Sequence, residues 1–309
     1  MNYANVLKIT IIFMVFFLAL SVVFFQLYRK CRSDLNSYIK AVQKENEEHT
    51  DFLSNMLHEL KTPLSVILGA IQLMEMKKSI PSDDDKGYSK DLALIKYNCY
   101  RLLRLTNNLL EMSKAETGYL KLNAVYCNLS LLMEEIVNSV FPYAAQRSID
   151  LIFKNDGDAV FASVDIDKVE RIILNLLSNS IKFTESGGTI VVSIFNNGGT
   201  ANITVDDTGL GIPSAMQEEI FNRYKQSGTK PLIEGNGSGI GLSLVKSYID
   251  LHKGSIKVSS EPGHGSRFSI NLPVTQEGAD MRKFNYEEYF SRIKEAAKIE
   301  FSSLHKFAS

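Results

Sequence analysis

The chain has 309 residues, of which 45% are hydrophobic and 22% are charged, a composition typical of a globular protein large enough for two domains. Its 34 Lys and Arg and 35 Asp and Glu give a formal net charge of -1, so overall charge offers no support for nucleic acid as a partner. The 3 cysteines are widely spaced and include no Cys-x-x-Cys pair, which argues against a zinc site or a disulfide framework.

The first predicted element is a transmembrane helix over residues 9–28. Residues 9–25 read ITIIFMVFFLALSVVFF, and the segment approaches the roughly 20 residues that span a bilayer. A cleaved signal peptide is the alternative, but the basic sequence YRKCR follows the apolar segment without a small-residue cleavage site. These basic residues outweigh Lys8, so we expect a single-pass protein of the plasma membrane whose remaining chain is cytoplasmic.

Residues 29–50 favour a helical linker, and a helical domain is predicted over residues 51–118. Two apolar stripes at coiled-coil spacing indicate its two long helices. The stripes are formed by Leu53, Leu57, Leu60, Leu64, Ile67, Ile71 and Met74, and by Leu92, Ile95, Cys99, Leu102, Thr106 and Leu109. A lone hairpin buries little apolar surface, so we expect a homodimer in which two hairpins form a four-helix bundle.

Residues 119–274 change to half-buried strand patterns that alternate with helices and Asn-Gly-Gly turns. This alternation predicts a second domain, a two-layer α/β sandwich. A C-terminal tail over residues 275–309 is again helical in character. Its weak apolar face comprises Phe290, Ile293, Ala297, Phe301 and Leu304. Packing on a domain and a frayed surface helix are both compatible with this pattern.

Three segments of the second domain carry polar or glycine-rich patterns. In RIILNLLSNSIKFT, Asn175 and Asn179 lie one helical turn apart, with Lys182 three residues further on; a single amide pair of this kind is usually a surface feature. The sequence VDDTGLGIP sets Asp207 beside the small residues Gly209 and Gly211, which allow a ligand to approach the backbone.

The third segment, GNGSGIGLSLVK, precedes a predicted helix. Its glycines include Gly237, Gly239 and Gly241, so successive backbone N–H groups and a helix N-terminus can hold phosphates. A flexible surface loop is the alternative for any single glycine-rich segment. The P-loop pattern is absent, because no Gly-Lys-Ser/Thr follows.

A histidine lies in the first helix, within FLSNMLHELKTPL. His58 falls outside the apolar stripe, and Thr62 lies one turn later on the same outward side. A solvated surface histidine is the alternative to a functional one. Pro63 removes a helical hydrogen bond beside His58 and is expected to kink the helix.

In this order and spacing, the motifs resemble those of the sensor histidine kinases of two-component systems. The matching segments are FLSNMLHELKTPL (H box), RIILNLLSNSIKFT (N box), DDTGLGIP (G1 box), EEIFNRYKQ (F box), GNGSGIGL (G2 box) and EPGHGSRFSINLP (closing strand). The resemblance covers about residues 50–273. It implies a Bergerat-type (GHKL) ATP-binding domain after a dimeric phosphoacceptor hairpin.

The resemblance also implies ATP and Mg²⁺ as ligands. Asn179 would ligate Mg²⁺, Lys182 would contact the phosphates, and Asp207 would accept a hydrogen bond from the adenine amino group. Asn175 and Phe183 would complete the nucleotide site, together with the glycines at 209, 211, 237, 239 and 241.

The implied activity is autophosphorylation of His58, with Glu59 orienting and deprotonating it, followed by transfer to an aspartate of a response regulator. Thr62 matches the position at which the family's phosphatase activity aligns a water molecule. Two alternatives remain: a GHKL-fold ATPase or serine kinase, and a non-catalytic signalling scaffold. Asn175, where related ATPases have a glutamate, argues against the first, and the intact motif residues argue against the second.

Overall fold

The computed structural model describes residues 3–78, 85–155, 157–222, 240–274 and 286–301. The chain divides into two compact units, residues 1–54 and 55–309. Helix α1 (Tyr3–Lys78) begins in the first unit and is helical across residues 29–50.

In the part of the chain that the structure describes, no helix is both long and apolar enough to cross a membrane. The transmembrane helix predicted for residues 9–28 is therefore not confirmed.

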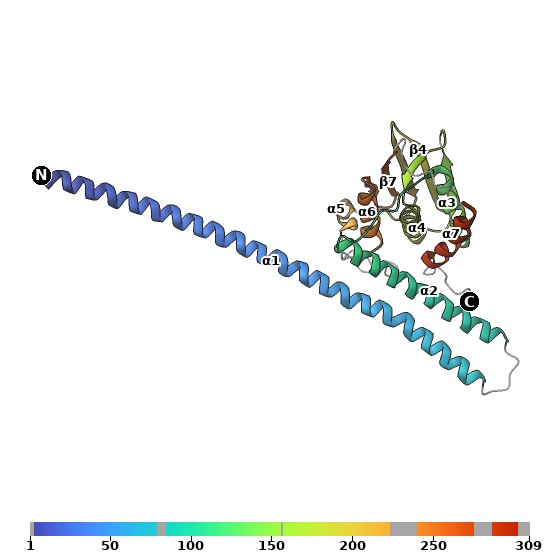
Figure 1. The fold of residues 1–309 in the computed structure, drawn as a ribbon. Helices are drawn as coiled ribbons and strands as arrows, with labels where there is room; N and C mark the ends of the chain where they lie inside the picture. Colours follow the sequence, from blue (N-terminus) through green and yellow to red (C-terminus); the bar gives the residue numbers. More distant parts are fainter. Residues whose placement is uncertain (1–2, 79–84, 156, 223–239, 275–285, 302–309) are drawn as a thin grey trace. The chain divides into compact units, whose positions relative to one another are not determined.

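In the second unit, the end of α1 and helix α2 (Asp85–Glu116) form the predicted helical hairpin, with α2 running back alongside α1 (Figure 1). Met56 and Ala70 are each only 2% exposed, and Pro63 is buried between them at the same heptad spacing. In contrast, Leu57 and Leu64 of the predicted apolar stripe remain 68% and 50% exposed.

The hairpin therefore buries the stripe predicted for α1 only in part, because Leu60 and Ile67 are half-buried while Leu57 and Leu64 are exposed. A helix of a four-helix bundle packs against two neighbours, so its apolar positions spread over two adjacent faces. One face is buried within this chain, and the other remains exposed in it. Helix α1 continues through Pro63, and the kink predicted there stays a prediction.

The remainder is the predicted two-layer α/β sandwich. Its elements are β1 (Val125–Asn128), α3 (Leu129–Gln146), β2 (Asp150–Asn155), β3 (Phe161–Val164), α4 (Ile166–Phe183), β4 (Thr189–Asn196), β5 (Thr200–Asp207), α5 (Ser214–Gln217), η1 (Glu219–Phe221), α6 (Gly241–Leu251), β6 (Ser255–Glu261), β7 (Gly265–Pro273) and α7 (Tyr286–Glu300). The main sheet has the order β2-β4-β5-β7-β6, and β1 pairs with β3. Among the described strands of the main sheet, β2 and β4 pair in parallel, and the other neighbouring strands pair antiparallel.

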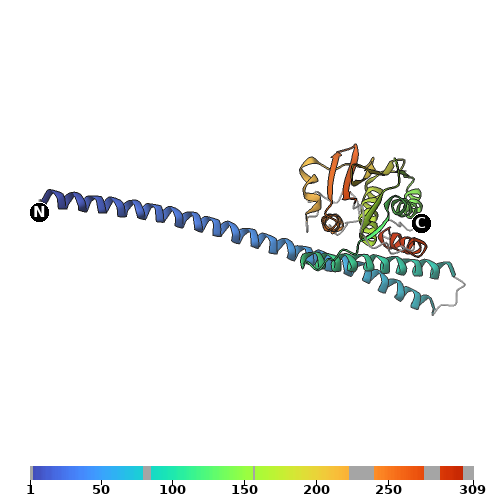
Figure 2. The same cartoon turned by 45° about the horizontal axis from the view of Figure 1, so that its top comes forward.

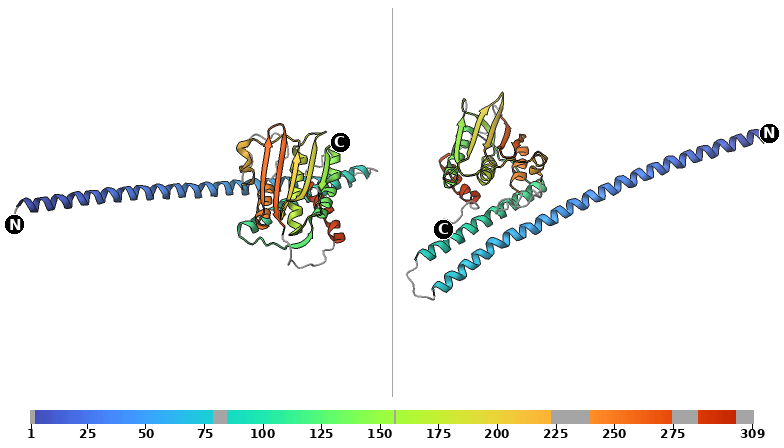
Figure 3. Two further views of the ribbon diagram at one scale, coloured as in Figure 1. Left: turned by 90° about the horizontal axis from the view of Figure 1, so that it is seen from above. Right: turned by 180° about the vertical axis from the view of Figure 1, so that it is seen from behind.

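One face of the main sheet is covered by α3, α4 and α6 (Figure 3). Strands β4 and β5 alternate buried and half-buried residues, as expected for a sheet with one covered face. Helix α4 presents Ile172, Ile173, Leu176 and Leu177 to this core, each no more than 1% exposed. Its first turn is capped by Asp165, whose side chain accepts a hydrogen bond from the backbone N–H of Lys168.

The C-terminal tail packs on this domain. Helix α7 contacts α3 and α4, and it also contacts α2 (Figure 2). Ile293, Ala297 and Phe301 of its predicted apolar face are at most 1% exposed. Leu304 lies outside the described residues. Of the two alternatives for the tail, the structure therefore supports packing.

Candidate active site

Asp207 is the last residue of strand β5, and the turn of the G1 segment follows it. One of its carboxylate oxygens accepts a hydrogen bond from the backbone N–H of Gly209 at 3.0 Å, and the other accepts one from the Ser180 hydroxyl at 3.1 Å. Burial raises the pKa of Asp207, while these hydrogen bonds lower it. The carboxylate is thus held in one orientation by α4 and by its own turn.

Gly209 and Gly211 allow the G1 turn to lie against its neighbours. A Cβ atom on Gly209 would approach the Phe183 carbonyl oxygen to 2.6 Å, and one on Gly211 would approach the Glu261 carbonyl oxygen to 2.1 Å. Gly211 also has a φ of 71°, in the left-handed region that favours glycine. The backbone N–H of Leu210 donates to the Phe183 carbonyl, so the turn is fastened to the end of α4.

The two N-box amides meet as the sequence spacing predicts. The Asn179 side chain donates from Nδ2 to Asn175 Oδ1 at 3.3 Å. A Cβ atom on Gly241 would lie 2.4 Å from Asn175 Nδ2, so only glycine lets the N-terminus of α6 approach the amides this closely. Ile240 is the N-cap residue of α6, and its apolar side chain makes no capping hydrogen bond. The backbone N–H groups in the first turn of α6 are therefore left for other acceptors.

Lys182 lies in the last turn of α4. Its Nζ is 5.1 Å from the centre of the Phe183 ring, which is 42% exposed as a residue. Burial lowers the pKa of Lys182, the charge of Arg104 lowers it further, and Glu59 opposes the shift. The N-box lysine and the H-box glutamate therefore lie within each other's electrostatic influence.

These residues fit a nucleotide with Mg²⁺. An Asn179 amide that donates through Nδ2 keeps its oxygen for a hard cation, and Mg²⁺ usually binds few protein oxygens together with substrate phosphates. Among the described residues, no group of three or more His, Cys, Asp or Glu could hold a metal ion. A site built from one amide oxygen and phosphates does not need such a group.

The H-box residues lie on different sides of α1. His58 and Thr62 are exposed, and the Thr62 hydroxyl donates back to the His58 carbonyl at 3.1 Å. Glu59 is half-buried: burial raises its pKa, and the charges of Arg101 and Arg104 on α2 oppose this. The base role of Glu59 stays a prediction, because adjacent helical residues do not face each other.

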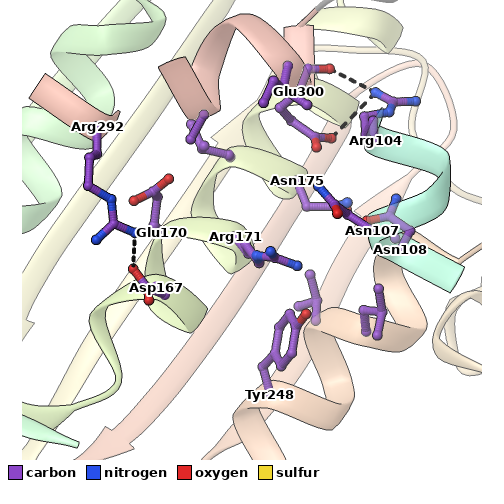
Figure 4. Close-up of a pocket in the computed structure, with 16 residues that line it drawn as sticks. Arg104, Asn107, Asn108, Asp167, Glu170, Arg171, Asn175, Tyr248, Arg292 and Glu300 are labelled. Carbon is purple, nitrogen blue, oxygen red and sulfur yellow. Dashed lines mark hydrogen bonds and ion pairs between the residues drawn. The ribbon is translucent and has the colours of Figure 1, made fainter. Parts of the chain in front are cut away.

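Two predicted ligands, Gly237 and Gly239, lie outside the described residues. Sequence reasoning also missed a cavity between α2 and the second domain (Figure 4). Its polar lining includes Arg104, Asn107, Asn108, Arg171, Asn175 and Tyr248. The helical spacing of Arg104 and Asn108 was the only available signal, and it did not indicate their partners.

Two protein families match the chain. The His Kinase A (phospho-acceptor) domain family matches residues 48–118, which carry His58. The histidine kinase-, DNA gyrase B- and HSP90-like ATPase family matches residues 164–276, which carry Asp207 and the N-box residues. Fold and site together define a phosphoacceptor hairpin joined to a GHKL-type ATP-binding domain.

Among similar proteins, the sensor histidine kinase TmoS of Ectopseudomonas mendocina is 37% identical over 249 residues, which are 80% of this chain and 25% of TmoS. Full-length ShkA, solved in complex with AMPPNP, aligns with a TM-score of 0.56 and 23% identity over 74% of this chain and 46% of that chain. Histidine kinase ThkA, solved in complex with response regulator protein TrrA, aligns with a TM-score of 0.52 and 23% identity over 73% of this chain and 61% of that chain.

The chain belongs to the sensor histidine kinase family of two-component systems. The two solved structures support the shared fold. The chain spans about a quarter of the length of TmoS.

Proposed function

We propose that this chain transfers the γ-phosphoryl group of Mg-ATP to His58 and then to an aspartate of a response regulator. The observation that carries the proposal is the pairing, in one chain, of an exposed H-box histidine with an ATP-binding domain whose N-box amides contact each other. Neutral imidazole is suited to both steps, because it is nucleophilic at cytoplasmic pH and forms a labile phosphoramidate.

In the first step, the unprotonated ring nitrogen of His58 attacks the γ-phosphorus. The P–O bond to the β-phosphate breaks, and ADP leaves with the bonding electrons. Glu59 accepts the proton from the other ring nitrogen, a role favoured by the raised pKa that burial gives this carboxylate. Mg²⁺ held by Asn179 would neutralise charge on the phosphates, and Lys182 would add a second positive charge.

Phosphotransfer profiling tests this proposal. A fragment that begins at Ser33 is labelled with ATP that carries a tagged γ-phosphate, and the label is then offered to every response regulator of the source genome. We expect rapid transfer to one or a few regulators. Failure of the chain to become labelled would contradict the kinase assignment, and labelling without transfer to any regulator would contradict the partner assignment.

Asp207 provides a test of the adenine site. Replacing Asp207 with Asn should weaken ATP binding by about 10- to 100-fold, because a hydrogen bond to a charged group contributes roughly 1.5–3 kcal/mol. Calorimetric titration with ATP measures this effect. The matched control is Asp206→Asn, which alters the neighbouring carboxylate and its ion pair with the largely exposed Arg267. Equal affinity in both variants would remove Asp207 from the adenine site.

We further propose a phosphatase mode that depends on Thr62. Its exposed hydroxyl lies one turn from His58, where it can position water against a phosphorylated regulator. Thr62→Ala should slow regulator dephosphorylation by roughly 10- to 100-fold, the effect of losing a positioning group, while changing His58 labelling only a few-fold. Both assays use one preparation and independently phosphorylated regulator. Equal losses in both would instead indicate a damaged helix.

Two assembly features complete the proposal. The exposed leucines at 57 and 64 support a homodimer in which the hairpins form a four-helix bundle.

Near the N-terminus, α1 exposes large apolar side chains, including Phe24 at 74%, which supports a single-pass anchor in the plasma membrane. The full chain should float with lipid vesicles, whereas a fragment from Ser33 should remain soluble and dimeric by light scattering.

A further inference from the structure

Helix α7 lies beyond residues 164–276, the part of the second domain that the ATPase family matches. It contacts α3 and α4 on one side and α2 of the hairpin on the other (Figures 1 and 2). This helix therefore touches both parts of the kinase that must cooperate in phosphoryl transfer.

The contacts of α7 with the ATP-binding domain include buried aromatic and hydrogen-bonded side chains. Phe301, next to the end of α7, stacks on Tyr143 of α3 with ring centres 4.8 Å apart. The Tyr289 hydroxyl donates to the buried Glu170 carboxylate and to the Ile166 carbonyl of α4. These contacts make α7 a fixed part of the ATP-binding domain.

The contacts of α7 with α2 are polar. Arg104 donates from Nη1 to the Glu300 carbonyl at 2.8 Å and lies 3.5 Å from a Glu300 carboxylate oxygen. The Tyr100 hydroxyl donates to Glu295 at 3.0 Å. The Tyr100–Glu295 pair is exposed, whereas the Arg104 and Glu300 side chains are only 16% and 17% exposed. An exposed polar pair contributes little, and the charged groups of a buried pair regain water when they part, so this side of α7 is the one that can separate.

The cavity in Figure 4 shows what this contact does to the candidate active site. Asn175 and Gly241, at the phosphate end of that site, line the cavity together with Arg104, Asn107 and Asn108 of α2. His58 is not among the residues that line it. With α7 on α2, these phosphate-end residues face α2 of the same chain.

We propose that α7 is a restraint that holds the ATP-binding domain on α2 in a resting arrangement, and that separation of α7 from α2 promotes phosphorylation of His58. The proposal rests on the kinase function proposed above. ATP and the regulator must reach His58 in turn, so the ATP-binding domain has to change position during the cycle. A helix that is fixed to this domain and joined to α2 by polar contacts controls that change.

Loosening the restraint gives the first test. The double variant Tyr100→Phe, Glu295→Gln removes the hydrogen bond between α2 and α7 without altering the buried side of α7. Its initial rate of His58 labelling should rise at least about threefold, a modest population shift suited to the loss of weak polar contacts. The control Arg292→Gln breaks the pair between α7 and Asp167 of α4, and it should label like the wild type.

Locking the restraint gives the second test. The substitutions Tyr100→Cys and Glu295→Cys, made in a Cys31→Ser, Cys99→Ser background, allow the two side chains to be joined by a reducible bismaleimide. The joined protein should label several-fold more slowly than the same protein after reduction of the linker. Equal rates before and after reduction, or equal rates in the loosened and control variants, would overturn the restraint. A wild-type chain that takes no label would overturn the kinase function itself.

Discussion

Replacing His58 with glutamine is expected to reduce labelling by γ-tagged ATP at least about 1,000-fold, because the variant lacks the nucleophile. The change keeps a polar side chain at an exposed helical position, so the hairpin should remain folded. Gel autoradiography after a fixed incubation measures the label. In the wild type, the label should be lost in acid and retained in base, as expected for a phosphoramidate.

The matched control is His49→Gln, which makes the same substitution earlier in α1 and should leave labelling unchanged. Label that survives acid, or that persists in the His58 variant, would assign the phosphoryl group to another side chain. Circular dichroism of both variants verifies that α1 and α2 are retained.

Asn179→Asp should reduce autophosphorylation by at least about 100-fold, since it alters charge stabilisation where the metal and triphosphate meet. The aspartate cannot donate to Asn175 Oδ1, and it brings a negative charge beside that oxygen and the bound phosphates. The rate of His58 labelling at saturating Mg-ATP is the measurement. Asn138→Asp, the same change on an exposed position of α3, is the control. Wild-type labelling in the Asn179 variant would show that the neutral, hydrogen-bond-donating amide is not needed at this position.

The fold was predictable because its main elements have regular patterns. Heptad spacing indicated both hairpin helices, and the one-turn spacing of Asn175 and Asn179 correctly predicted that the amides would share a face. Periodicity does not identify what a face packs against. The heptad spacing therefore indicated a packed stripe that includes Leu57, although the hairpin buries the neighbouring face that includes Met56.

Long-range partners were beyond the sequence for the same reason. Arg104 and Glu300 are 196 residues apart, and each is a common surface residue in its own helix. The helical pattern of the tail indicated an apolar face, but nothing in it indicated α3, α4 and α2 as the surfaces that α7 contacts. The surroundings of Glu59 could not be predicted either. The charges that act on it, those of Arg101 and Arg104 of α2 and Lys182 of α4, are brought near it only by the fold.

The packing of α7 also bears on how this protein could diversify. Ile293, Ala297 and Phe301 are fully buried, so α3 and α4 would expose apolar surface if α7 were lost. A recombination event that joined this ATP-binding domain to a different hairpin would have to carry α7 with it or supply another apolar helix. If α7 were inherited in this way, Glu295 and Glu300 would come with it, and the new hairpin would need partners for them at the positions of Tyr100 and Arg104.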